Sequence, residues 1–325
     1  MRALLVVNPN ATTTTPGGRD VITQALGSEL KLDVLETTCR GHAARAAAEA
    51  TVDGFDVVVV HGGDGTVNEV VNGMMDAAGA EHASPWGRPA VAVVPGGSAN
   101  VFARALGGPR DPVEATATIL DALRAQRDVV VGLGRVDPAP SPRPRPAGEA
   151  GGRWFTFNAG LGWDAEVVAA VEEARAAGLE ATPLRYAGTA VKHYVDQRRR
   201  PRSMTVEIPG AAPVPDVRLA FVTTTHTWTY LGSRAVRTNP GTSVRSGLGL
   251  FGMRDLGAGT IASTLRRMLA PGGDPRGRNV LRQDAVASVT VRCAEPVALQ
   301  VDGDLLGRHR EVRFRAVRDA LRVVV

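Results

Sequence analysis

The stretch Phe55–Gly73 has the sequence FDVVVVHGGDGTVNEVVNG and joins a buried strand to a helix through a glycine-rich turn. Four consecutive valines, Val57–Val60, are typical of a parallel strand that is covered on both faces. Three glycines follow within four positions, and valines then recur at helical spacing from Val67. The pattern therefore predicts a strand, a turn and a helix that begins near Thr66.

Such a turn is suited to hold a phosphate group. Glycine allows positive φ angles and lets the main chain approach a ligand closely. The unpaired N–H groups at a helix start, together with the helix dipole, attract an anion. Asp64 is unexpected beside phosphates unless a divalent cation lies between them, which points to magnesium. The alternative is an ordinary strand-to-helix turn, in which Gly and Asp are common.

The composition fits a globular chain of two ordinary domains, with 325 residues and 44% hydrophobic residues. Cys39 and Cys293 form neither a metal pattern nor a disulfide framework, so we expect a reducing compartment. The start of the chain, MRALLVVNPN, has one Arg and a five-residue apolar run that is too short for the core of a signal peptide and suits a first buried strand. No apolar run approaches the roughly 20 residues that span a bilayer. These features favour a cytoplasmic location.

The net charge of +5 comes almost entirely from arginine, since only Lys31 and Lys192 are lysines. A moderate positive excess suits anionic membrane surfaces, nucleotides or nucleic acid and does not choose between them. Genome composition alone can also enrich a chain in arginine. The run Arg198–Arg202 could hold anionic lipid headgroups, or it could be a solvated helix exit whose charges suit the helix dipole.

A second glycine turn follows the next predicted strand. Val91–Val94 is followed by PGGSANVFAR at residues 95–104, and a helix again begins there. Turns that end neighbouring strands lie at the carboxyl edge of a sheet, where open α/β sheets bind ligands. Residues 8–17 follow the strand predicted at 3–7 and meet the same edge. Thr37 follows another strand, although a threonine before a helix is often only an N-cap.

Residues 62–73 resemble the GGDGTxNEVxNG signature of the diacylglycerol kinase family of lipid kinases, which includes the sphingosine kinases. NAD kinases share only the GGDGT part. Residues 95–104 resemble the family's PxGTxNDFAR, with Ser98 in place of Thr and Val101 in place of Asp. The resemblance implies a Rossmann-like α/β nucleotide-binding domain of the NAD kinase and lipid kinase type at residues 1–128. A mainly antiparallel β-sandwich domain would follow at 129–317, and a strand at about 318–325 would return to the first domain.

The resemblance also implies which residues contact ATP. The family's NPxSG-like segment matches residues 8–12 only in part, because Ala11 and Thr12 replace Ser and Gly. Asp64 would hold Mg²⁺ through the ATP phosphates. The implied nucleotide-binding residues are Asn8, Thr12, Thr37, Gly62, Gly63, Asp64, Gly65, Thr66, Asn68, Glu69, Gly97, Ser98 and Asn100.

Asp302-Gly303-Asp304 resembles the family's DGE motif, whose Glu is the proposed base for the lipid hydroxyl. The resemblance implies that Asp304 is the catalytic base, with Asp302 as the fallback. Asp304 is shorter than Glu by one methylene, roughly 1.5 Å. A misplacement of ~1 Å can lower a rate on the order of 100-fold. Asp304 must therefore sit closer to the substrate, or activity is reduced.

Two stretches of the second domain depart from the family. Residues 137–152, DPAPSPRPRPAGEAGG, have alternating prolines and predict an extended, exposed insertion. In many bacterial members the stretch that matches Pro240–Leu248 holds a structural magnesium. The matching positions are Ser243, Ser246 and Leu248, so no carboxylate is left for a hard cation and Arg245 has entered. We expect this accessory site to be degenerate.

Together these observations predict a lipid kinase that uses ATP and Mg²⁺ and phosphorylates a lipid hydroxyl, most readily that of diacylglycerol, to give phosphatidic acid. The expected partners are the lipid at the inner face of the membrane and anionic headgroups, with a homodimer left open and no nucleic acid. An NAD kinase-like phosphotransferase is one alternative. A catalytically impaired nucleotide- and lipid-binding protein is another, suggested by Val101 and Asp304.

Overall fold

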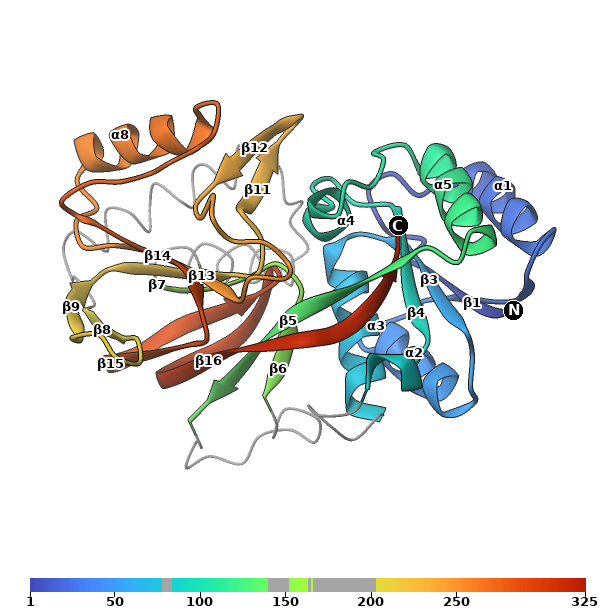
Figure 1. Cartoon of the computed structure of the whole chain (residues 1–325), viewed down its shortest axis with the longest axis horizontal. Coiled ribbons are helices and arrows are strands. Elements are labelled where there is room, and N and C mark those ends of the chain that lie inside the picture. Colours follow the sequence, from blue (N-terminus) through green and yellow to red (C-terminus); the bar gives the residue numbers. More distant parts are fainter. Residues whose placement is uncertain (78–83, 140–151, 163–164, 166–202) are drawn as a thin grey trace. The chain divides into compact units, whose positions relative to one another are not determined.

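The structure, a computed structural model, describes residues 1–77, 84–139, 152–162, 165 and 203–325 (Figure 1). It consists of two compact units. The first unit comprises Met1–Leu133, Tyr230–Gly232 and Val317–Val325, and the second comprises Gly134–Thr229 and Ser233–Ala316. The domain bounds expected from the sequence stay predictions, because compactness does not test where a functional domain begins. The Pro-rich stretch at 140–151 and Arg198–Arg202 lie outside the described residues.

The first unit is built on a parallel sheet in the order β4-β3-β1-β2. Its strands are β1 (Arg2–Val7), β2 (Lys31–Glu36), β3 (Val57–Gly62) and β4 (Ala90–Pro95). Every residue of β3 is buried, as the valine run predicts for a strand covered on both faces. Val59 pairs with Leu5 on one side and with Ala92 on the other, so β3 lies inside the sheet.

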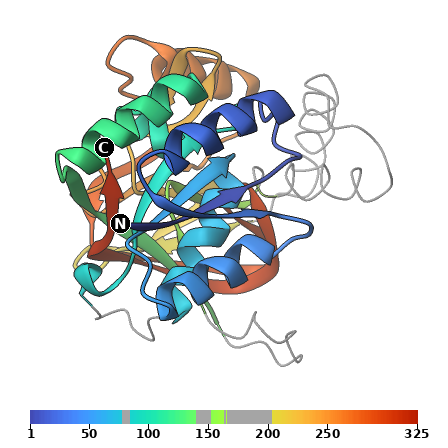
Figure 2. The same cartoon turned by 90° about the vertical axis from the view of Figure 1, so that its right-hand side faces the viewer.

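Helices cover both faces of this sheet: α1 and α5 lie together on one face, and α2 and α3 lie on the other (Figures 1 and 2). Gly73 of α3 allows the close packing against α2, because a Cβ there would lie 1.9 Å from the Ala44 carbonyl oxygen. The helices are α1 (Pro16–Gly27), α2 (His42–Val52), α3 (Asp64–Ala77), the 3₁₀ helix η1 (Pro85–Gly87), α4 (Val101–Ala105) and α5 (Pro112–Arg124).

The second unit is mainly antiparallel. The central strand β15 pairs with β16 along one side and with β8 and then β7 along the other. Its core is made of alternating apolar side chains such as Val222, Leu250 and Leu299. The remaining elements are β5 (Asp128–Pro138), β6 (Arg153–Phe155), β7 (Asn158–Gly162), β8 (Met204–Glu207), β9 (Val214–Val217), β10 (Leu219–Thr223), β11 (Thr227–Leu231), β12 (Arg234–Arg237), β13 (Leu248–Met253), α8 (Ala258–Leu269), β14 (Val280–Val286), β15 (Ser288–Val301) and β16 (Asp304–Val324).

The long strand β16 begins in the second unit and ends in the first, where Val323 pairs in parallel with Val91 of β4. The predicted combination of a parallel α/β fold with a mainly antiparallel one is confirmed. Among the residues that the structure describes, no helix has the length and apolar character that crossing a bilayer requires.

Candidate active site

The two glycine turns meet at the carboxyl edge of the parallel sheet, where β3 and β4 end. Their main chains touch: a Cβ on Gly97 would lie 2.7 Å from the Gly63 Cα, and a Cβ on Gly96 would lie 2.9 Å from the Gly62 Cα. The Gly96 N–H donates to the Gly62 carbonyl at 2.8 Å. Glycine is therefore required here by the contact between the turns, in addition to any contact with a ligand.

Asp64 opens α3, and its carboxylate caps the start of α4. Its Oδ2 accepts the Val101 N–H at 3.0 Å, and its Oδ1 accepts the Phe102 N–H at 3.2 Å. Both oxygens are thus engaged by main-chain donors that tie the two turns together. Within the described part of the chain, no three His, Cys, Asp or Glu side chains form a group that could hold a metal. A resident, protein-held magnesium does not fit this site, and the Asp64 contact to ATP-bound Mg²⁺ stays a prediction.

Asn100 shapes the second turn. It adopts a left-handed conformation, with φ 47° and ψ 50°, which asparagine tolerates better than most residues. Its Oδ1 accepts the Gly97 N–H at 2.9 Å, and its Nδ2 donates to the Gly97 carbonyl at 2.6 Å. This reciprocal pair fixes the main chain of the turn. Gly65 and Ser98 are exposed on the rim of the two turns, where a ligand can reach them.

Two residues of the first motif hold neighbouring loops, and a third makes a contact within its own helix. Thr66 Oγ1 accepts from Asn8 Nδ2 at 3.1 Å, which ties the loop after β1 to α3. Glu69 Oε1 accepts the Gly41 N–H at 2.9 Å and so ties the loop after β2 to the same helix. Asn68 is fully buried and accepts from Asn72 Nδ2 at 3.1 Å. These side chains were predicted to bind nucleotide, and the contacts that the structure gives them are internal.

The structure brings all the predicted nucleotide-binding residues to one edge of the first unit. Thr13, next to the exposed Thr12, donates its N–H to the Gly96 carbonyl at 2.9 Å, so the first loop reaches the second glycine turn. The Thr37 N–H donates to the Val7 carbonyl at 2.8 Å, which places Thr37 at the end of β1. His61 precedes the first turn with 1% of its surface exposed, and burial lowers its pKa.

Asp302 and Gly303 form the two-residue turn between β15 and β16, with φ angles of 47° and 89°. Two positive φ angles are typical of a type I′ hairpin. The Asp302 carboxylate is buried and accepts four hydrogen bonds: Thr156 N (2.7 Å), Thr156 Oγ1 (2.8 Å), Phe157 N (3.1 Å) and Asn158 N (3.0 Å). Burial raises the Asp302 pKa, and these hydrogen bonds act in the opposite direction. Asp302 anchors the turn, and this geometry does not suit the fallback role of base.

Asp304, the predicted base, is the first residue of β16. Its Oδ2 lies 2.8 Å from Nη2 of Arg153 in β6, and the Asp304 side chain is 20% exposed. Arg153 is not among the site residues predicted from the sequence. The two residues are 151 positions apart, and no local pattern around Arg153 links it to the turn.

The positions of the accessory metal site form a turn. Ser243 donates its N–H to Ser246 Oγ at 2.8 Å, and Leu248 is fully buried at the start of β13. Nearby, the Asp284 carboxylate accepts from Asn239 Nδ2 at 2.9 Å and lies 3.5 Å from Arg282 Nη2. The degenerate character of this site stays a prediction.

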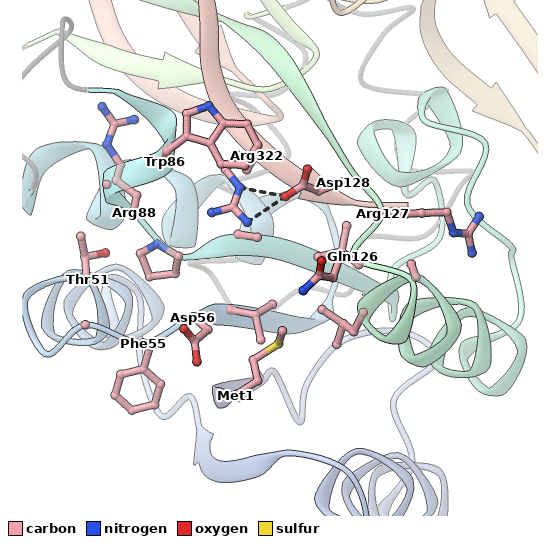
Figure 3. Close-up of a pocket in the computed structure, with 18 residues that line it drawn as sticks. Met1, Thr51, Phe55, Asp56, Trp86, Arg88, Gln126, Arg127, Asp128 and Arg322 are labelled. Atoms are coloured by element: carbon pink, nitrogen blue, oxygen red, sulfur yellow. Dashed lines mark hydrogen bonds and ion pairs between the residues drawn. The ribbon is translucent and has the colours of Figure 1, made fainter.

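A cavity of about 530 Å³ lies at the opposite edge of the parallel sheet, beside the first residues of β3 and β4 (Figure 3). Arg322 stacks on the Trp86 ring at 4.5 Å and forms an ion pair with Asp128 at 2.7 Å on one wall. None of the predicted site residues lines this cavity. The candidate site is therefore the edge with the glycine turns.

Residues 2–131 match a family model described as "Diacylglycerol kinase catalytic domain". The chain is 34% identical over 169 residues to a diacylglycerol kinase of Bacillus subtilis (strain 168), which covers 50% of this chain and 46% of the relative. It is 43% identical over 89 residues to a "Probable lipid kinase YegS-like" of Chromohalobacter salexigens, which covers 27% of each chain. The matches thus span less than half of the length of these relatives.

A crystal structure of a diacylglycerol kinase from Bacillus anthracis str. Sterne has the same fold, with a TM-score of 0.69 and 18% sequence identity. The match covers 99% of this chain and 96% of that one. Both glycine turns and their capping contacts lie inside the matched segment. Over residues 2–131 the chain is therefore similar to the diacylglycerol kinase catalytic domain family.

Proposed function

We propose that the protein is an ATP-dependent lipid kinase that transfers the γ-phosphate of ATP to a lipid hydroxyl group. The observation that carries the proposal is the pair of touching glycine turns at one sheet edge, inside the segment that matches the diacylglycerol kinase catalytic domain. The names of the relatives from Bacillus subtilis and Staphylococcus carnosus favour diacylglycerol as the acceptor, with phosphatidic acid as the product.

In the proposed reaction the lipid hydroxyl oxygen bonds to the γ-phosphorus, and the bond from that phosphorus to the β–γ bridging oxygen breaks. ADP leaves with the bridging oxygen, and the hydroxyl proton passes to the Asp304 carboxylate. Main-chain N–H groups of the turns, with Gly65 and Ser98 on their exposed rim, would hold the phosphates. Magnesium would arrive with the triphosphate as part of the substrate, and its charge would offset the repulsion between the phosphates and Asp64.

The test is transfer of labelled phosphate from ATP to a panel of acceptors that contains diacylglycerol, sphingosine and NAD. Asp304→Asn keeps the size of the side chain and removes its ability to accept a proton. We expect kcat on the best lipid to fall by a factor on the order of 100 to 10,000, as is typical for loss of a general base. A variant that keeps the full rate would refute the base assignment, and a wild type that phosphorylates only NAD would refute the lipid kinase.

A catalytically impaired nucleotide- and lipid-binding protein is the second candidate. Two observations favour it: Val101 stands where the family motif has Asp, and the shorter Asp304 is held in an ion pair. Calorimetric titration with ATP, alongside the transfer assay, separates the candidates. Binding of ATP without transfer to any lipid would favour the impaired protein.

We also propose a cytoplasmic protein that binds the inner face of the membrane, where its acceptor lies. The last turn of α8 carries Arg266 and Arg267, and the loop that follows carries the exposed Arg276 and Arg278. Each arginine near an anionic surface contributes about 1 kcal/mol. Vesicle flotation should therefore show tighter binding to anionic than to neutral bilayers, and equal binding would argue against the proposal.

Light scattering would test whether the protein forms a homodimer. We expect no nucleic-acid partner.

A further inference from the structure

The hairpin turn that carries Asp304 is tied to the segment 153–158 at two points. Asp302 accepts hydrogen bonds from the main-chain N–H groups of Thr156, Phe157 and Asn158. Asp304 forms its ion pair with Arg153 at 2.8 Å, three positions before Thr156. The carboxylates of Asp302 and Asp304 thus both bind one short segment of the second unit.

The segment itself is held in place by further hydrogen bonds. Gln300 Nε2 donates to Asn158 Oδ1 at 2.9 Å, and the Asp302 N–H donates to the Asn158 carbonyl at 2.8 Å. Thr224 Oγ1 donates to the Thr156 carbonyl at 2.6 Å. Arg153 belongs to β6 and pairs with Val136 of β5. The main chain on both sides of the ion pair is therefore fixed, and the direction of the Asp304 side chain is set by Arg153.

We propose that Arg153 is a positioning residue that holds the Asp304 carboxylate in the orientation from which it accepts the lipid proton. This inference rests on the proposed function. A guanidinium group is planar and gives directed hydrogen bonds, so it fixes a carboxylate better than a flexible ammonium group does. The ion pair engages Oδ2 of Asp304. A short Asp tolerates little misplacement, since ~1 Å can lower a rate on the order of 100-fold.

The first experiment measures lipid phosphorylation by Arg153→Gln. We expect kcat to fall by a factor of about 10 to 100, with an unchanged KM for ATP, because the change displaces the base and leaves the glycine turns intact. Arg315→Gln is the matched control, because it breaks an Arg–Asp pair of the same length, 2.8 Å to Asp137, in the same unit. Both variants should lose similar stability in thermal unfolding, and only Arg153→Gln should lose rate. Equal rates in the two variants would overturn the proposal.

The second experiment asks whether a longer acid relieves the need for Arg153. Asp304→Glu in the Arg153→Gln background should recover at least part of the lost kcat, because the extra methylene restores reach without the arginine. A purely structural role for Arg153 would give no such recovery, and its absence would overturn the proposal. If the wild type transfers no phosphate, the proposed function fails, and the role of Arg153 is then tested by crystal structures of the wild type and of Arg153→Gln. The Asp304 carboxylate should occupy one position in the wild type and a different position in Arg153→Gln. An Asp304 carboxylate that does not move in the variant would overturn the inference.

Discussion

The glycine turns of the first unit and the Asp302–Asp304 region of the second unit are stabilised by different kinds of contact. In the first unit, main chain packs on main chain: Gly96 and Gly97 touch Gly62 and Gly63. In the second unit, the contacts are made by side-chain carboxylates, because Asp302 and Asp304 bind the segment 153–158. The contact between the turns should be lost when a side chain is added at Gly96 or Gly97, whereas the contacts of the second unit should be lost when a carboxylate is removed. The predictions below test this difference.

The largest effect should follow removal of a carboxylate. Asp302→Ala leaves four buried donors without their acceptor, and we expect the free energy of unfolding to fall by at least about 3 kcal/mol. Asp216→Ala is the matched control, because Asp216 also has a positive φ but is exposed and accepts one hydrogen bond, from Ser203. Urea denaturation of both variants checks this, and equal losses would show that backbone conformation, not the carboxylate, is what matters.

The next effect is the addition of a methyl group between the glycine turns. Gly97→Ala should cost about 1–3 kcal/mol of stability, since the new Cβ would lie 2.7 Å from the Gly63 Cα. Gly65→Ala is the control for stability, because no atom lies within 4 Å of a Cβ at that position. Thermal unfolding measures both. If Gly97→Ala were as stable as Gly65→Ala, the close contact between the turns would not be a constraint.

Asp64 is a carboxylate that lies among the main-chain contacts of the glycine turns, so the first unit also contains a contact of the kind found in the second. Asp64→Ala removes the cap of α4 and should cost about 1 kcal/mol. Asp111→Ala removes the equivalent cap of α5, where Asp111 accepts from the N–H groups of Val113 and Glu114, and should cost the same. Only Asp64→Ala should also weaken ATP binding in a calorimetric titration. Equal ATP affinity in the two variants would limit Asp64 to capping.

The smallest effect concerns pH. Burial lowers the pKa of His61 below its ordinary value of about 6.5, so the folded state favours the neutral ring while the unfolded state takes up a proton. Stability should be complete above about pH 6.5 and should fall as the pH drops below it. His61→Gln should lose less stability between pH 7.5 and pH 5.5 in urea denaturation. Burial also lowers the pKa of His226, so part of the pH dependence of stability should remain in the variant. An unchanged dependence in the variant would contradict this.

The difference between the glycine turns and the carboxylate contacts also explains how much could be predicted from the sequence. The strand, turn and helix at Val57–Ala77 follow from local patterns, because glycine turns and valine runs carry their physical cause within a few residues. The parallel fold was predictable for that reason. The resemblance placed Asn68 and Glu69 among the nucleotide ligands, yet a motif does not separate a side chain that touches a ligand from one that makes internal contacts.

The Asp302–Asp304 region of the second unit could be predicted only in outline. The composition of Asp302-Gly303-Asp304 indicates a tight turn, and the turn is present. Its partners are 144 to 151 positions away in sequence, at Asn158 and Arg153, so they depend on tertiary packing that no local pattern records. The role of Asp302 as an anchor becomes visible only when its four donors are known.

The return of β16 to the first sheet has a consequence for modularity. Val317–Val325 belong to the first unit although the whole second unit precedes them in the chain. A fragment that stops at Leu133 would leave the Val91 side of β4 without its neighbour Val323 and would expose an apolar strand edge that invites aggregation. Recombination could therefore not exchange the first unit as one continuous segment, and any swap would have to include the last strand as well.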